Sequence, residues 1–205
     1  MDPLIGNMLG DGHLRFTHKD KEGKVRGNYH YAMTSKSYEY IMHLWSNIYS
    51  SICTTTLPNP WPNPKTGLIP TQYTFHTKSL IQLTILHKLW YKWSDDLNKF
   101  IKIVPLNILD LLTPIGLAHW IMDDGHKHGN GITLCTDSFT LIEVELLVSV
   151  LRNKFNLEAN YKKRTQKGRH IGWRIYISAK SANKEKLISL VKPYFIPSML
   201  YKLGI

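Results

Sequence analysis

The chain has 205 residues, of which 43% are apolar and 20% are charged, and its formal net charge is +11 at pH 7. This balance excludes a disordered polar tail, and no uninterrupted apolar run approaches the roughly 18 to 20 residues that a membrane-spanning helix needs. The positive charge suits a polyanionic partner, although many basic proteins bind nothing acidic.

The N-terminal segment predicts a helix followed by a β-hairpin. Residues Leu4 to Gly12 read LIGNMLGDG, and the preceding Asp2-Pro3 is typical of a helix N-cap and first turn. A glycine such as Gly12 can end the helix. Polar and apolar residues then alternate in two stretches, which predicts a two-stranded hairpin spanning His13 to His18 and Tyr29 to Thr34.

The rest of the first half predicts a helix, a second hairpin and a closing helix. Helical spacing places apolar residues on one face at Ile41, Leu44, Trp45 and Ile48. The second hairpin should span Cys53 to Thr77, interrupted by a proline-rich loop from Pro58 to Pro64. Leu80 to Trp90 should form the closing helix, and the join to the second half should lie near Pro105 to Thr113.

The second half predicts the same succession of elements. Thr113-Pro114 is again typical of a helix start, and Leu117 to Gly125 reads LAHWIMDDG before a hairpin that runs through Gly131 to Thr136. The next helix should bury Leu141, Val144, Leu147, Val148 and Leu151. A second hairpin should span Ala159 to Ser178 and turn at 166–168, before a last helix over Lys184 to Val191.

The two motif segments form an internal repeat whose shared feature is a final Asp-Gly. Asp11 and Asp124, 113 residues apart, should therefore occupy the same local setting in the last turn of a helix. Two equivalent carboxylates suggest a shared metal site. We predict an N-terminal subdomain over 1–107 and a C-terminal subdomain over 108–205, with net charges of +5 and +6.

Basic residues cluster in one hairpin of each half. A charge run is usually only a solvated face, but two basic hairpins at equivalent places in a repeat favour DNA binding, because a β ribbon fits the major groove. The predicted DNA-binding residues are Arg15, Lys19, Lys24, Arg26, Lys36 and Lys78 in the first half, and Lys162, Lys163, Arg164, Lys167, Arg169 and Arg174 in the second.

The two motifs resemble the paired signature motifs of the LAGLIDADG homing endonucleases, in their single-chain, intron-encoded form. The second copy, with WIMDDG, is the stronger match, and the tail 191–203 also reads like the C-terminal end of the family. The resemblance implies an α+β fold of two pseudo-symmetric αββαββα units. It implies a two-helix interface formed by the motifs, and a saddle of antiparallel strands for DNA.

The two motif helices should pack closely through small residues. Gly6 and Gly10, four residues apart, supply them on the first helix. The second copy has His119 and Asp123 where the family usually has small residues. Either His119 points to the edge of the contact, or the two helices cross asymmetrically.

The resemblance implies a monomeric, Mg²⁺-dependent nuclease that makes a double-strand break in a long, pseudo-palindromic DNA target. Asp11 and Asp124 would bind the metal through carboxylates, and Gly10 and Asp123 through main-chain carbonyls. Hard divalent cations held by oxygen stabilise the charge that develops in phosphodiester hydrolysis. The catalytic basic residues implied are Lys102 and Lys202, while Ser35 and Thr136 would organise water.

Other interpretations stay open at this point. Family members can also act as RNA-splicing maturases on host intron RNA, and a DNA-binding protein without cleavage is a third possibility. The family implies a mitochondrial or other organellar location. His13 and His126 suit loop positions or DNA-backbone contacts better than a transition-metal site. The isolated Cys53 and Cys135 predict buried, reduced thiols in an intracellular protein, and we expect core positions for Trp45, Trp90, Trp120 and Trp173.

Overall fold

The computed structural model describes residues 1–19 and 25–205, with side chains described outside 17–26. The chain forms two compact units, one of residues 1–10 and 90–205 and the other of residues 11–89. The subdomain division after residue 107 follows the internal repeat and stays a prediction. Within the described ranges, no helix is long and apolar enough to span a bilayer.

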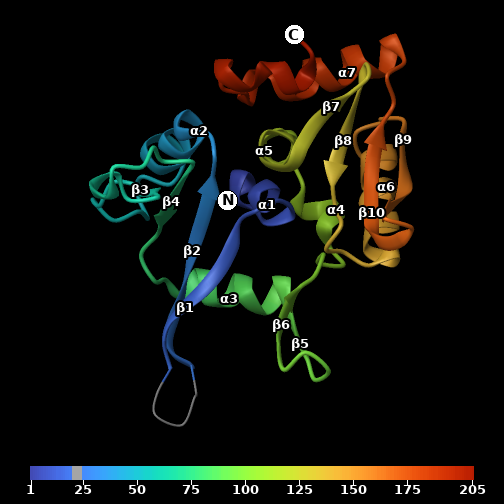
Figure 1. Ribbon diagram of the computed structural model, residues 1–205. Coiled ribbons are helices and arrows are strands. Elements are labelled where there is room, and N and C mark those ends of the chain that lie inside the picture. Colours follow the sequence, from blue (N-terminus) through green and yellow to red (C-terminus); the bar gives the residue numbers. More distant parts are fainter. Residues whose placement is uncertain (20–24) are drawn as a thin grey trace. The chain divides into compact units, whose positions relative to one another are not determined.

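The element order repeats the predicted αββαββα succession (Figure 1). The first series is α1 (Asp2–Leu9), β1 (His13–Lys19), β2 (Val25–Ser35), α2 (Tyr38–His43), β3 (Asn59–Trp61), β4 (Gln72–His76) and α3 (Ile81–Trp90). The second series is α5 (Pro114–Asp124), β7 (Gly125–His128), β8 (Gly131–Cys135), α6 (Leu141–Asn153), β9 (Ala159–Gln166), β10 (Arg169–Ile177) and α7 (Ser181–Val191).

Shorter elements connect these series. The helix α2 continues as a π-helical turn η1 (Leu44–Ile48), and the chain ends in the 3-10 segments η3 (Lys192–Tyr194) and η4 (Pro197–Leu203). A further 3-10 turn, η2 (Pro64–Thr66), follows β3. The sequence did not predict β3 inside the proline-rich loop, or the three elements between α3 and α5: β5 (Tyr91–Ser94), β6 (Lys99–Lys102) and α4 (Ile108–Leu111). Of these three, only α4 lies in the predicted join.

The two four-stranded sheets are antiparallel and have equivalent strand orders, β1-β2-β4-β3 and β7-β8-β10-β9. The β9–β10 hairpin turns where predicted, because Lys167 and Gly168 both adopt positive φ angles, 50° and 75°, which suit a two-residue hairpin turn. The helix α6 packs against β9 and β10 (Figure 1). One face of this second sheet is therefore covered by a helix.

The helix α6 shows how local sequence sets the core. Thr140 and Glu143 form a capping box at its start, and the side chains of Val144, Leu147 and Leu151 are buried. The predicted core positions of Trp90 and Trp120 are confirmed, since both are fully buried. Trp45 and Trp173 are only half-buried, so their assignment to the core was wrong in part.

The predicted start of α1 was also wrong in detail. Asp2 is the first helical residue rather than the N-cap, which is Met1 without a side-chain hydrogen bond. The equivalent prediction for α5 is confirmed, because the Thr113 hydroxyl accepts a hydrogen bond from the Gly116 amide at 3.3 Å. Asp2 still stabilises α1, since a carboxylate in the first turn complements the helix dipole.

The helices α1 and α5 pack directly against each other within the first unit. At Gly6, an added Cβ would lie 1.9 Å from the Gly116 carbonyl oxygen and 2.8 Å from the Trp120 amide nitrogen. Gly6 therefore acts as predicted, and its partner on α5 is another glycine, Gly116, which the sequence did not single out. His119 is 1% exposed, so it lies in the interior.

Gly6→Ala should destabilise the protein, because the new methyl group would overlap the backbone of α5. Overpacking of this kind costs about 1–3 kcal/mol or more, and an overlap with rigid backbone belongs at the upper end of that range, above the roughly 1 kcal/mol that alanine gains in helix propensity. Gly116→Ala is the matched control, since its Cβ would lie 3.1 Å from its nearest neighbours. Urea unfolding would measure the stability of both variants. Equal unfolding midpoints for Gly6→Ala and Gly116→Ala would contradict the close packing of Gly6 against α5.

Candidate active site

The two motif ends differ in their local structure. Gly10 ends α1 with non-helical angles of φ −98° and ψ −139°, so Asp11 is exposed beyond the helix and begins the second unit. Asp124 is instead the last residue of α5 and is half-buried. The expectation that both aspartates share one helical setting was therefore wrong.

The physical reason lies at Gly10. Its amide donates to the carbonyl oxygens of Asn7 at 3.1 Å and Gly6 at 3.2 Å, which closes α1 one residue before the aspartate. A Cβ on Gly10 would lie 2.2 Å from Oδ2 of Asp123. The Asp123 carboxylate thus occupies the space beside Gly10 that a side chain would need, and it lies at the contact between the two motifs.

Each of the two lysines implied by the resemblance reaches the main-chain carbonyl at one motif end. Lys102, at the end of β6, donates from Nζ to the Gly10 carbonyl at 2.6 Å. Lys202, in η4, donates from Nζ to the carbonyls of Met122, Asp123 at 3.1 Å and Ile121 at 3.5 Å. The structure therefore brings Lys102 to Gly10 and Lys202 to Asp123, which are the carbonyls that the resemblance implies as metal ligands.

The position of Lys202 has a clear electrostatic basis. Its residue is 9% exposed, and its ammonium lies at the C-terminal end of α5, where the helix dipole and unpaired carbonyls favour a cation. The last residues of α5 thus combine a bound ammonium with the carboxylates of Asp123 and Asp124.

The donor chemistry of the motif ends fits a hard divalent cation. A carbonyl oxygen has two lone pairs, so donation from a lysine leaves a second for a metal, and carboxylate and carbonyl oxygens are the ligands that Mg²⁺ prefers. Among the described residues, no three His, Cys, Asp or Glu side chains gather as a metal-binding group.

The second sheet sorts its basic residues between two faces. In the strand register, Arg174 pairs with Lys162 and Gly172 pairs with Arg164. The side chains of Arg174, Lys162 and Arg164 therefore lie on one face of the sheet. Lys163 pairs with Trp173 on the opposite face, toward α6, where Trp173 contacts Tyr161 and Tyr161 donates to Glu145 of α6 at 2.8 Å. Lys163 thus differs from the other predicted DNA-binding residues of its strand.

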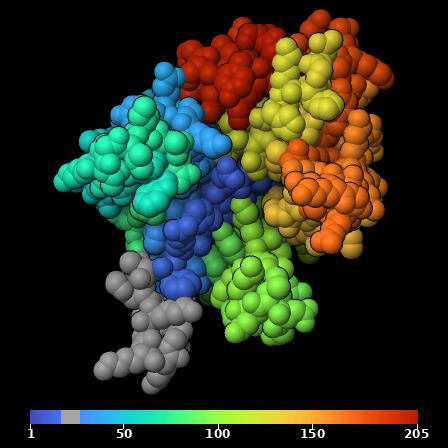
Figure 2. Space-filling view, viewed as in Figure 1, coloured from blue at the N-terminus to red at the C-terminus, as the bar shows by residue number. Residues whose placement is uncertain are grey.

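The face that carries Arg174 lies away from α6 and continues across β7 and β8. Lys162 lies 4.8 Å above the ring of Tyr176, which is itself in edge contact with His128. Lys167 and Arg169 flank the turn at the tip and are exposed. The strands β9 and β10 form part of the surface of this unit, drawn in orange in Figure 2.

The basic residues of the first sheet lie on a different hairpin. In strand order β1–β2 corresponds to β7–β8 rather than to β9–β10, so the expectation that the two basic hairpins occupy equivalent places in the repeat was wrong. Arg15 pairs with His30 in register, and the rings of His30 and His76 are in edge contact at 5.4 Å. Burial lowers the pKa of both histidines, and the charge of Arg15 lowers it further. Lys36 and Lys78 are exposed. Three predicted DNA-binding side chains lie outside the described residues: Lys19, Lys24 and Arg26.

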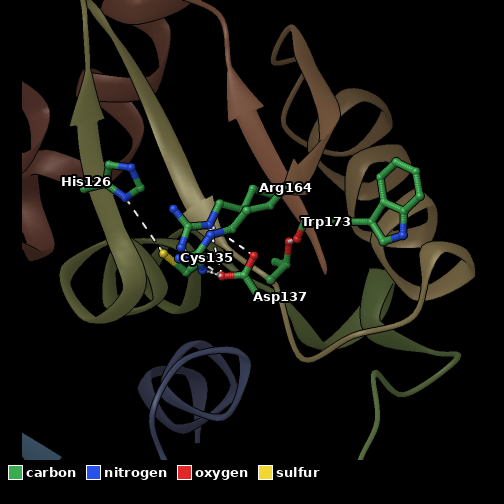
Figure 3. A network of polar contacts seen from close by, with 7 residues as sticks. His126, Cys135, Asp137, Arg164 and Trp173 are labelled. Carbon is green, nitrogen blue, oxygen red and sulfur yellow. Dashed lines mark hydrogen bonds and ion pairs between the residues drawn. The ribbon is translucent and has the colours of Figure 1, made fainter. Parts of the chain in front are cut away.

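A charge network that the sequence did not reveal lies on the face of the second sheet that carries Arg174 (Figure 3). Asp137 forms ion pairs with Arg164 and, at 2.8 Å, with Arg174, and Trp173 points away from it in Figure 3. Two predicted DNA-binding arginines therefore share one carboxylate. No motif marks Asp137, which lies outside the basic run, so only the folded chain identifies it.

The remaining candidates have structural partners. The Thr136 hydroxyl donates to the Trp173 carbonyl at 2.6 Å, and Ser35 accepts from the Ser37 amide at 3.2 Å. Their role in organising water stays a prediction. His126 Nδ1 lies 3.9 Å from the sulfur of Cys135, and burial, with smaller contributions from nearby cations, lowers the pKa of His126.

Both cysteines are free thiols, as the sequence predicts. Cys53 is buried, and this burial raises its pKa to about 11. Cys135 is only half-buried, and burial raises its pKa as well. Neither thiol therefore has the lowered pKa of a nucleophilic or metal-binding cysteine.

Comparison with known proteins decides the family. The model of the LAGLIDADG DNA endonuclease family matches residues 1–184. The chain belongs to this family. The LAGLIDADG relatives include the cytochrome b mRNA maturase bI2 of Debaryomyces hansenii, which is 34% identical over the full chain and 73% of its own length. The chain spans only 46% of the bI2 maturase of Saccharomyces cerevisiae, to which it is also 34% identical over 98% of its residues.

A solved LAGLIDADG structure confirms the fold. The homing endonuclease I-WcaI, determined bound to its DNA recognition sequence, superposes with a TM-score of 0.79 at 26% identity. The match covers 98% of this chain and 84% of I-WcaI. The α+β fold with two αββαββα series, inferred from the paired motifs, is therefore correct.

Proposed function

We propose that this protein is a site-specific homing endonuclease that makes a Mg²⁺-dependent double-strand break in a long, pseudo-palindromic DNA target. The observation that carries the proposal is the pair of lysines at the motif ends, Lys102 on the Gly10 carbonyl and Lys202 on the Asp123 carbonyl. Two equivalent combinations of a carbonyl and an ammonium suit two scissile phosphates, one on each strand. The similarity to I-WcaI supports DNA as the substrate.

Asp11 and Asp124 would supply the carboxylates for the metal, and Gly10 and Asp123 the main-chain oxygens. A bound Mg²⁺ would lower the pKa of attacking water and neutralise charge on the phosphate and the leaving oxygen. Lys102 and Lys202 would place positive charge beside the reacting phosphates before the reaction begins, so little reorganisation would be needed in the transition state. The Asp123 side chain would fix the Gly10 region.

The basic faces of the sheets would bind the duplex. Phosphate contacts would come from the exposed residues Lys162, Lys167 and Arg169. Defined contacts suit Arg164 and Arg174 better, because their ion pairs with Asp137 hold both guanidinium groups in place. We propose a monomer, because the chain itself contains both motif copies and needs no second chain to supply one. The relatives named cytochrome b maturases support an organellar location.

A cleavage assay tests this function directly. The substrate is a linear duplex that carries the uninterrupted exon junction of the host gene, incubated with the protein and Mg²⁺, and then with excess EDTA. We expect two fragments with Mg²⁺ and none with EDTA, because no described side chain could replace the metal as a Lewis acid. An intact duplex in Mg²⁺, when the protein binds it, would contradict the nuclease function.

A maturase function is the second candidate, because two relatives at 34% identity are named mRNA maturases. It would use the basic surface to bind host intron RNA and would not need Asp124. Splicing of the precursor RNA in the presence of Asp124→Asn protein would separate the two functions. A variant that supports splicing without cutting DNA would establish the maturase function. A DNA-binding protein that lacks both activities would neither support splicing nor cut DNA.

A further inference from the structure

The ion pairs of Asp137 fix one arginine in a defined orientation. Oδ1 and Oδ2 of Asp137 lie 3.2 and 3.0 Å from Nε of Arg174, and Oδ2 lies 2.8 Å from Nη2. Such bidentate pairing holds the planar guanidinium far more firmly than a single contact does. Arg174 is also 25% exposed at its side chain, so it is held at the surface rather than buried away from it.

The pairing leaves the outer edge of the guanidinium for another partner. A guanidinium carries five N–H donors, and Asp137 engages the edge formed by Nε and Nη2. The edge formed by Nη1 and Nη2 has the geometry that binds guanine O6 and N7 in the major groove. Arg174 can therefore remain paired with Asp137 while it reads a base.

The backbone holds Asp137 in place. Gly172 has a φ of 150°, at a bulge in β10, and a Cβ there would lie 2.6 Å from both Cα and the carbonyl oxygen of Asp137. The loop after β8 is thus pressed against β10, and Arg164 contributes a second ion pair to the same carboxylate. The Asp137 carboxylate lowers the net positive charge of a surface that would bind a polyanionic duplex. A carboxylate at this place is unexpected if the two arginines served only to attract phosphates.

We propose that Asp137 is a positioning residue, which presents Arg174 to one guanine in the major groove of the target and so sets the base preference at that position. This inference rests on the proposed function, because it assumes that the face of the second sheet that carries Arg174 contacts DNA. It assigns a role to an acidic residue in a basic interface. General attraction to the duplex remains the task of the exposed lysines.

The test separates base preference from general affinity. Wild-type protein first selects its preferred target from a pool of randomised duplexes. Binding to every single-base-pair variant of that target is then measured for four proteins: wild type, Arg174→Ala, Asp137→Asn and Glu158→Gln. Glu158 is the matched control, since its carboxylate is also in an ion pair, with Lys180 at 2.8 Å, and its removal changes the net charge by the same amount. Lys180 and Glu158 are both exposed.

We expect Arg174→Ala to lose about 5- to 150-fold of the preference at one base pair, the range for a bidentate base contact. Asp137→Asn should lose preference at that same base pair, by about threefold or more, while its affinity for non-specific DNA rises as much as in Glu158→Gln. Thermal unfolding of each variant shows whether it is folded. If Asp137→Asn does not fold, Asp137→Ser takes its place.

Each result has a distinct meaning. Loss of preference at the same base pair in Asp137→Asn and Arg174→Ala supports the positioning role. If wild type selects a target but Asp137→Asn retains the base preferences of Glu158→Gln, the ion pairs only stabilise the fold and the inference is wrong. If wild type selects no target at all, the proposed function fails and this inference fails with it.

Discussion

Asp124→Asn should reduce DNA cleavage by about a thousandfold or more while leaving DNA binding intact. The substitution keeps the size of the side chain but removes the negative charge that would hold a divalent cation at the end of α5. Loss of one preorganised electrostatic group in a catalytic centre typically costs about 10²–10³ in rate, and loss of a metal ligand removes the cation as well. Binding should persist, because the variant gains one unit of positive charge toward the duplex.

The matched control is Asp110→Asn, which removes the carboxylate of an exposed residue in helix α4 of the same unit. Cleavage of the linear target under saturating protein would measure the rate, and a mobility shift in EDTA would measure binding. Asp110→Asn should cut like wild type. Cleavage by Asp124→Asn at the control rate would overturn the metal role of this residue.

The repeat allowed most of the fold to be predicted. Apolar periodicity and turn residues are local signals, so the paired helices and hairpins could be located from the sequence, down to the turn at Lys167 and Gly168. The β5–β6 hairpin was missed because it lies between α3 and the predicted join, outside the repeated pattern. It nevertheless matters, since β6 ends at Lys102 and delivers its ammonium to Gly10.

The site could be predicted only in part. Gly10, Asp123 and the two lysines were singled out because a resemblance connects residues that are far apart in the chain. The structure shows each lysine on its carbonyl, while the role of these residues in a metal site stays a prediction. The close approach of the Asp123 carboxylate to Gly10, at the end of α1, is a tertiary contact that no local pattern encodes.

Tertiary contacts also decide the role of the basic residues. Arg164 and Arg174 look like any other cations in the run, and they differ only because the loop after β8 brings Asp137 to them. The same holds for Lys163, whose strand position alternates away from Lys162 and Arg164. Counting charge predicts a polyanionic partner, whereas strand register predicts which charges can act together.

Lys202→Met should slow cleavage by about a hundredfold, because the ammonium on the Asp123 carbonyl would stabilise negative charge on one scissile phosphate. Methionine keeps the length of the side chain and removes its charge. Lys192→Met is the control, since Lys192 is exposed in η3 and its loss lowers the net charge of the same unit equally. Thermal unfolding would show whether the buried substitution leaves the protein folded.

The same cleavage assay on Lys102→Met tests whether each motif end acts on the scissile phosphate of one DNA strand. If Lys102 and Lys202 act on different phosphates, each single variant should cut one strand at a nearly normal rate and the other slowly, so that nicked duplex accumulates. Strand-specific end labels should show the two variants leaving opposite strands intact. Equal slowing of both strands in both variants would instead mean that the lysines stabilise the α1–α5 contact as a whole, because a loss of that packing would disturb both phosphates together.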